Sequence, residues 1–176
     1  IARDKNAERS DCLREEDNIA LVTSLKKAID IEGNILPDMR ENQPVCEQTS
    51  RIDGESAGRE LFVRMANFIG EPTTVLIKKA CLQKGNWGFT GNEGKYLIGD
   101  YTLWLQLLSK GDMIYITKPL SYFRIHEGQE SANVNVQIQS TLCWAIAIQH
   151  AWKHRLYIKD ESCLRSIICQ WLILAV

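Results

Sequence analysis

Three side chains in the second half of the chain could take part in chemistry: Asp100, Arg124 and His126. The arginine and the histidine end an apolar, strand-like stretch, LSYFRIH, which runs into a polar loop. Side chains two residues apart on a strand face the same side, so these two could hold a phosphate group or complete a metal site. A loop histidine that is hydrogen-bonded to nearby backbone explains His126 without any ligand, and both interpretations remain open.

Asp100 follows a glycine-rich stretch and opens the helical pattern DYTLWLQLLSKG. Aspartate is among the best helix N-caps, and this role alone accounts for the residue. A carboxylate at a loop-to-helix junction could instead take a proton from a substrate hydroxyl. The residues by themselves do not decide between the two roles.

Two other groups of residues have simpler explanations. His150 and His154 have the i, i+4 spacing of a zinc-binding pair, but the intervening residues contain no glutamate as in H-E-x-x-H, so we expect no metal there. Trp144, Trp152 and Trp171 lie in the last two helical stretches, where we expect them to anchor a core or an interface.

Composition excludes several classes of protein. The chain has 176 residues and 45% hydrophobic side chains, which predicts one globular domain or slightly more. Its 21 basic and 22 acidic side chains leave no net field to attract nucleic acid. No apolar run approaches the roughly 18 residues of a membrane span. Six cysteines without a C-x-x-C pair indicate free thiols, and therefore a cytoplasmic location.

The order of elements predicts an α/β fold rather than a helical bundle or an all-β fold. Apolar runs predict strands at 19–24 and 73–79, and two more strands, MIYIT and LSYFRI, separated by Lys118-Pro119. Helices are predicted from Asp53 to Asn67, from Asp100 to a C′ glycine at Gly111, over 133–155 and from Asp160 onward. A hairpin turn is expected at 32–34, and a mobile loop at 85–94.

Three stretches taken in order resemble the second half of bacterial family 2 glycosyltransferases with the GT-A fold. They are IALVTSLKKAIDIEGNILPD, NFIGEPTTVLIKK and GDYTLWLQLLSKGDMIYITKPLSYFRIHEGQES, and the likeness runs from about residue 15 to residue 131. The last block is the most specific. The resemblance implies a GT-A-like mixed sheet with flanking helices, followed by two C-terminal helices.

The resemblance also implies an activity and a set of site residues. Such enzymes move a sugar from a nucleotide-diphosphate donor to an acceptor hydroxyl, such as that of a glycan, with inversion at the anomeric carbon. Asp100 would be the general base, because an alcohol is a poor nucleophile until its proton is removed. His126, with Arg124 beside it, would contact the donor pyrophosphate or serve as a late ligand of a divalent cation, Mn²⁺ or Mg²⁺. Gly70, Glu71 and Thr73 would line the acceptor side.

The nucleotide-binding half of the family has no counterpart here. Its D-D-x-S loop and the Asp-x-Asp motif that the cation needs are both missing from the sequence. We therefore expect residues 1–131 to be the acceptor-side half of a catalytic domain and residues 132–176 to be a helical extension, with the isolated fragment inactive. A different class remains open: a non-catalytic carbohydrate-binding or oligomerisation module that forms a homo-oligomer through its tryptophan-rich helices.

Overall fold

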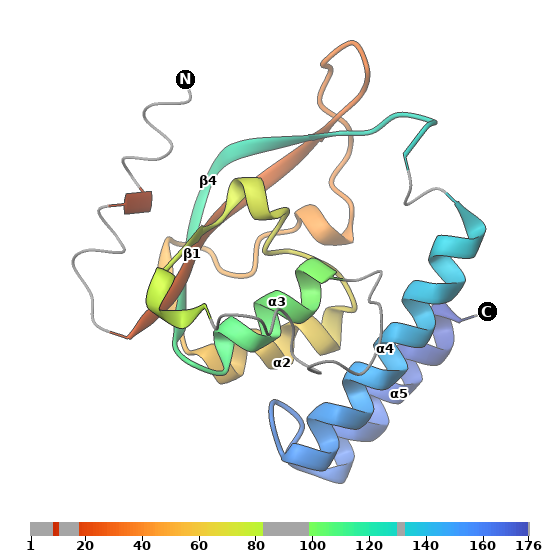
Figure 1. Ribbon diagram of the computed structural model, residues 1–176. Helices are drawn as coiled ribbons and strands as arrows, with labels where there is room; N and C mark the ends of the chain where they lie inside the picture. The colour runs from red at the N-terminus through yellow and green to blue at the C-terminus, as the bar shows by residue number, and fades with distance from the viewer. Residues whose placement is uncertain (1–8, 11–17, 83–98, 130–132, 176) are drawn as a thin grey trace.

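The computed structural model describes residues 9–10, 18–82, 99–129 and 133–175. The loop predicted at 85–94 lies outside the described residues. Within them the chain forms a mixed sheet with helices packed beside it (Figure 1). This confirms the predicted α/β class with its flanking and C-terminal helices.

The sheet has four strands in the order β2–β4–β1–β3. Their bounds are Ile19–Ile29 for β1, Ser50–Ile52 for β2, Leu76–Ile77 for β3 and Asp112–Arg124 for β4. The long strands β1 and β4 are parallel neighbours, and the two short edge strands pair antiparallel to them. Most residues of β1 are buried, in line with its nearly continuous apolar sequence.

The prediction of two strands separated by Lys118-Pro119 was wrong, because β4 is one continuous strand. Its pairing with β1 shifts register between Ser24↔Ile116 and Lys26↔Ser121. Four residues of β4 therefore face a single residue of β1. Proline lacks the N–H that a regular ladder needs, and a bulge is one of the few places where a sheet accepts it.

Two other strand predictions were also too simple. The stretch 73–79 forms a 3₁₀ turn at Pro72–Thr74, the two-residue strand β3 and a second 3₁₀ turn at Lys79–Cys81. The predicted hairpin is a tight turn in which Gly33 has a φ of 95°, followed by one isolated bridge between Ile29 and Ile35.

Helices α2 (Gly54–Arg64) and α3 (Gly99–Leu108) pack against the sheet. Asp53 caps α2 as predicted, since its carboxylate accepts hydrogen bonds from the backbone N–H groups of Glu55 and Ser56. Met65 ends the helix in the left-handed conformation, two residues before the predicted end.

The predicted roles of both ends of α3 need correction. The helix begins at Gly99, so Asp100 lies inside the first turn and is not the N-cap. Gly111 does not have the positive φ of a C′ glycine; among the described glycines, Gly33 and Gly70 have it. Gly111 is needed for close packing instead, because a Cβ there would lie 2.6 Å from the carbonyl oxygen of Asn18.

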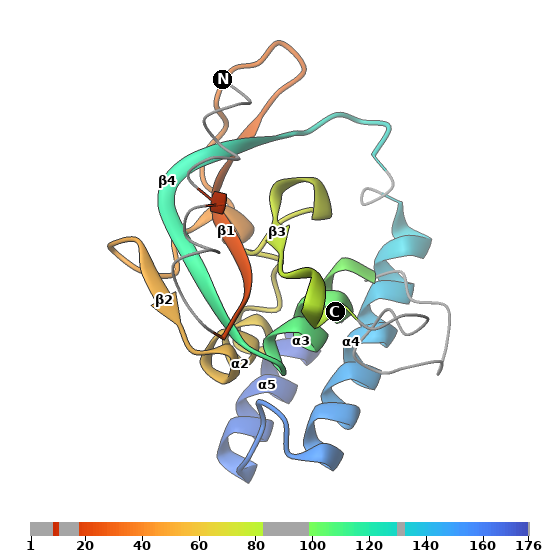
Figure 2. The ribbon, with the colours of Figure 1, turned by 60° about the vertical axis from the view of Figure 1, so that its left-hand side comes forward.

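The last two helices, α4 (Val134–His154) and α5 (Glu161–Leu174), form an antiparallel pair. Their N-caps are Asn133 and Asp160, close to the predicted starts. Both views place α2 and α3 between the sheet and this pair (Figure 2). Trp144 of α4 and Ile167 of α5 belong to the same hydrophobic core cluster as the residues of α2 and α3, so the four helices share one core.

Tyr157, in the connection between α4 and α5, ties this pair to the rest of the fold. Its hydroxyl donates to the carbonyl of Leu105 in α3 at 2.5 Å, and its ring lies over Gly58 of α2. Burial raises the pKa of Tyr157 well above that of a free tyrosine, so the hydroxyl keeps its proton and remains a donor.

Five cysteines lie within the described residues, and all five are free thiols, as predicted. Cys12 falls outside them. In the described part of the chain, none of the helices has the length and apolar character needed to cross a membrane.

Candidate functional site

A tight turn at residues 67–71 forms one wall of the candidate site. The side chain of Asn67 holds the turn, because its Oδ1 accepts from the N–H of Gly70 and its Nδ2 donates to the carbonyl of Gly70. The indole of Trp104 in α3 donates to the same carbonyl at 3.0 Å, and Thr23 of β1 donates to the carbonyl of Ile69. The turn is therefore fastened to both a strand and a helix.

Gly70 is required at this place for two reasons. Its φ is 109°, a conformation that side chains with a Cβ rarely adopt. A Cβ there would also lie 2.7 Å from the Oγ1 of Thr74. The turn that presents Glu71 is therefore the reason why a glycine stands at position 70.

Glu71 forms an ion pair with Lys26 of β1, with 3.1 Å between the carboxylate and Nζ. The side chain of Lys26 is only 6% exposed, and its ammonium group lies 5.5 Å from the centroid of the Phe123 ring. A buried lysine keeps its charge only when a partner offsets the cost of desolvation, and the carboxylate of Glu71 is that partner.

Asp100 of α3 lies within electrostatic reach of this ion pair. Burial, and then the negative charge of Glu71, raise the pKa of Asp100, while Lys26 opposes the rise. Three charged side chains from β1, the 67–71 turn and α3 therefore interact at one place. Carboxyl groups with a raised pKa are common among groups that exchange protons with a substrate, although structural clusters show the same effect.

An open cleft of about 700 Å³ lies beside Lys26 and Glu71. It is lined by β1, the loop after β1, the 67–71 turn and the segment that ends β4; the side chains are Lys26, Asp30, Leu36, Met39, Glu41, Asn42, Asn67, Glu71, Phe123, Ile125, His126, Glu127 and Gln129. We call this the β1–β4 cleft. It brings two of the predicted site residues, Glu71 and His126, into one hollow, although they are far apart in sequence.

The other predicted site residues are not among those that line the cleft: Gly70, Thr73, Asp100 and Arg124. Arg124 does not line the cleft; its Nη1 donates to the carbonyls of Asp30 and Ile31 at 2.8 and 2.7 Å. In this structure its guanidinium therefore holds the turn after β1. Thr73 is exposed on the 3₁₀ turn and is not among the residues that line the cleft.

The residues present do not by themselves suit a divalent cation. Within residues 9–10, 18–82, 99–129 and 133–175, no three histidine, cysteine or acidic side chains are grouped closely enough to hold a metal ion. His126 lines the cleft without such a group around it. His150 and His154 lie together on α4 with their ring centroids 4.4 Å apart, and they also lack a third ligand among the described residues.

Sequence reasoning missed Lys26, Asn42 and Phe123 as parts of the site. Lys26 offered a weak signal, since it and Lys27 are the charged residues of a mostly apolar strand, IALVTSLKKAI. Nothing local distinguishes Asn42 in a polar loop or Phe123 in a strand. Only the parallel pairing of β1 with β4, and the return of the loop over them, places these residues beside Glu71.

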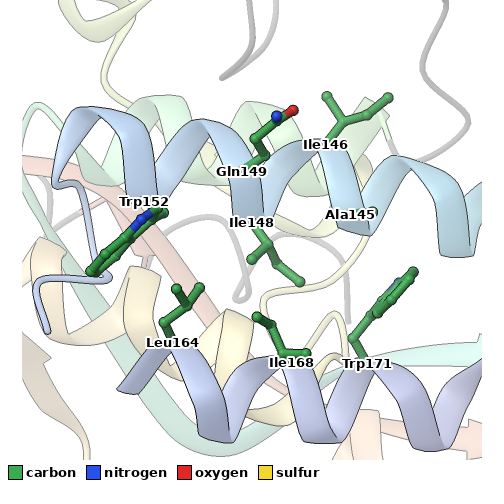
Figure 3. Close-up of a pocket in the computed structure, with 8 residues that line it drawn as sticks. All are labelled: Ala145, Ile146, Ile148, Gln149, Trp152, Leu164, Ile168 and Trp171. Carbon is green, nitrogen blue, oxygen red and sulfur yellow. The ribbon is translucent and has the colours of Figure 1, made fainter. Parts of the chain in front are cut away.

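A second hollow lies between α4 and α5 and has a different character. It has a volume of about 430 Å³, and Trp152 and Trp171 stand toward its opposite ends, with Ile148, Leu164 and Ile168 between them (Figure 3). Apart from Gln149, the side chains that line it are apolar or aromatic. It therefore suits apolar contact and offers no group for proton transfer.

The chain was also compared with known proteins. No protein-family model matches the chain. No curated protein matches it either. The candidate function therefore depends on the site geometry and on the sequence resemblance.

Proposed function

We propose that the chain is the acceptor-side part of an inverting glycosyltransferase. The observation that carries this proposal is the electrostatic coupling of Asp100 to the Lys26–Glu71 ion pair, whose two side chains line the β1–β4 cleft. It agrees with the role that the sequence resemblance implies for Asp100. The structure adds Lys26, to which the resemblance gave no role.

In the proposed reaction Asp100 is the general base. Its carboxylate takes the proton of the acceptor hydroxyl as the hydroxyl oxygen bonds to the anomeric carbon of the donor sugar. The bond from that carbon to the diphosphate oxygen breaks, and its electron pair leaves with the nucleoside diphosphate. Attack opposite the leaving group inverts the anomeric carbon. A raised pKa suits this task, because a base works best when its pKa is near the working pH.

We propose that residues outside this site are needed to bind the nucleotide-sugar donor. The resemblance implies that His126 contacts the donor pyrophosphate. His126 lines the β1–β4 cleft, where four carboxylates oppose a phosphate group, so the donor phosphates would be held mainly outside the cleft. Because the described residues do not form a metal site, we assign no step to a cation. The nucleotide would be held by a nucleotide-binding half of the kind that the resemblance implies, and the chain by itself would be inactive.

The experiment that tests this function is calorimetric titration with UDP-glucose, and then with other UDP-sugars, in the presence of Mn²⁺. It compares this chain with a version extended upstream by about a hundred residues, the size of a small domain. We expect binding, and sugar transfer to an added oligosaccharide, from the extended protein alone. Absence of both in the extended protein would count against the proposal.

The coupling between Asp100 and Glu71 gives a prediction that does not depend on activity. In Glu71→Gln a negative charge beside Asp100 is lost, so the pKa of Asp100 is expected to fall. The measurement is an NMR titration of the Asp100 carboxyl carbon in this chain. Glu161→Gln on α5, whose carboxylate pairs with Arg165, is the matched control and should leave the midpoint unchanged. An unaltered midpoint in Glu71→Gln would show that the two carboxyls do not interact.

A second candidate function, oligomerisation, is favoured by the outer face of α4 and α5. No charged side chain occurs in residues 133–149 or 166–176. The described parts of these two stretches lie side by side, and a hydrogen bond from Trp171 Nε1 to the carbonyl of Thr141 joins them. Apolar side chains are exposed there, among them Ile138, Leu142 and Leu172. Membrane-surface helices typically carry lysine and arginine beside their apolar face. An uncharged face fits a second copy of the chain better, because interface cores are depleted in charge.

This candidate predicts a dimer in which two α4–α5 pairs pack face to face. Leu142→Glu would bury a charge in the interface and should convert the dimer to a monomer, as measured by sedimentation velocity. Gln48→Glu, at an exposed position outside this face, is a control for the added charge. The melting temperature of each monomeric variant shows whether the fold is intact. A wild-type chain that sediments as a monomer at every concentration would reject this candidate.

A further inference from the structure

The side chain of Asn42 is the least explained polar group of the β1–β4 cleft. Asn42 ends the 3₁₀ turn Arg40–Asn42 and is only 1% exposed, yet it lines the cleft. Among the described residues its Nδ2 has no hydrogen-bond partner. A buried donor without a partner costs about 1–3 kcal/mol, so such groups are normally paired with water or a ligand. Because Asn42 lines the cleft, an oxygen atom bound there is the partner that we infer for this buried amide.

The charges around the cleft indicate which kind of oxygen it accepts. Four carboxylates line it, those of Asp30, Glu41, Glu71 and Glu127, and Lys26 is the one lysine or arginine among the lining residues that the structure describes. Lys26 is already paired with Glu71. A hydrogen bond from the side chain of Asn34 lowers the pKa of Asp30, so this carboxyl is ionised at neutral pH. The cleft thus repels carboxylate and phosphate groups, and it admits neutral hydroxyls and ammonium groups.

Apolar side chains form the remaining part of the lining. Phe123 is half-buried, and Leu36, Met39 and Ile125 lie around the same hollow. A sugar ring has an apolar face that packs on an aromatic ring and a rim of hydroxyls that need donors and acceptors. In the cleft the amide of Asn42 is a donor without a partner among the described residues, and the carboxylates of Glu41, Glu71 and Glu127 are acceptors. This combination suits a saccharide and not an apolar peptide.

We propose that the β1–β4 cleft binds a neutral or amino-substituted saccharide, with an oxygen of the sugar on Asn42 Nδ2, and that it excludes acidic sugars. The assignment of this saccharide as the acceptor depends on the proposed transferase function. The binding itself does not, because it follows from the lining of the cleft alone.

The experiment follows the Asn42 side-chain amide by ¹H–¹⁵N NMR while this chain is titrated with three disaccharides. They are cellobiose, which is neutral, chitobiose, which carries ammonium groups, and cellobiouronic acid, which carries a carboxylate. We expect cellobiose and chitobiose to shift the amide resonances with saturation, and the acid to leave them unchanged. Equal binding of the acid would overturn the proposal, as would a failure of all three to bind.

Substitution at position 42 provides the matched test. Asn42→Ala should weaken binding of chitobiose by about threefold to tenfold, the effect of one hydrogen bond. Gln139→Ala, an exposed amide on α4, should not change it. Because Nδ2 has no partner among the described residues, Asn42→Ala should keep its melting temperature. A large drop in melting temperature would show that the amide stabilises the fold, and this would overturn the proposal.

The two proposals can fail separately. If an extended protein binds the saccharide but transfers no sugar, the transferase function is rejected and the proposed saccharide site in the cleft remains.

Discussion

Replacement of Asp100 by asparagine is expected to abolish sugar transfer in a protein extended to include the nucleotide-binding half. The amide has nearly the shape of the carboxylate but cannot take a proton, so the acceptor hydroxyl would have to attack unassisted. Loss of a general base typically lowers kcat by about 10²–10⁴-fold. Binding of UDP-sugar, measured by calorimetry, should be unchanged, because Asp100 acts on the acceptor. Normal turnover in this variant would remove Asp100 from the mechanism.

The same substitution should not destabilise the fold. The pKa of Asp100 is raised, first by burial and then by Glu71, so the folded state binds this proton more tightly than the unfolded state does. The ionised carboxylate therefore opposes folding, and its contribution to stability falls as pH rises from the ordinary carboxyl pKa of about 4 through the higher folded value. Asp100→Asn lacks this penalty. Its free energy of unfolding at neutral pH should equal or exceed that of the wild type. This measurement distinguishes loss of the general base from loss of the folded structure.

The second large effect is expected from Gly58→Ala in α2. The new methyl group would overlap the ring of Tyr157, which cannot move away without losing its hydrogen bond to the carbonyl of Leu105. Overpacking together with a broken buried hydrogen bond predicts a loss on the order of 3 kcal/mol. This would exceed the gain of about 1 kcal/mol that alanine brings to a helix. Urea denaturation measures the difference.

Gly128→Ala is the control for this prediction. A Cβ at position 128 would come no closer than 3.6 Å to the ring of His126, an ordinary contact, so stability should change by less than about 0.5 kcal/mol. If Gly58→Ala were as stable as the wild type, the Tyr157 ring would not hold the α4–α5 pair against α2.

Features that depend on neighbouring residues could be predicted from the sequence. The carboxylate of Asp53 caps α2 by bonding to N–H groups two and three residues ahead, and Asn133 and Asp160 begin α4 and α5 in the same way. The buried strand β1 was evident from its apolar run, although the run showed only its first half. Such interactions span a few residues, and residue type alone therefore indicates them.

The details that only tertiary structure decided involve partners far apart along the chain. Lys118-Pro119 indicated a break, yet pairing with β1 keeps β4 continuous through a bulge. Arg124 donates to two carbonyl groups of the turn after β1, a contact that the sequence did not indicate. Lys26 can be buried in a strand because Glu71, 45 residues away, neutralises it. Local sequence does not contain these partners, since they meet only after β1, β4 and the 67–71 turn have packed together.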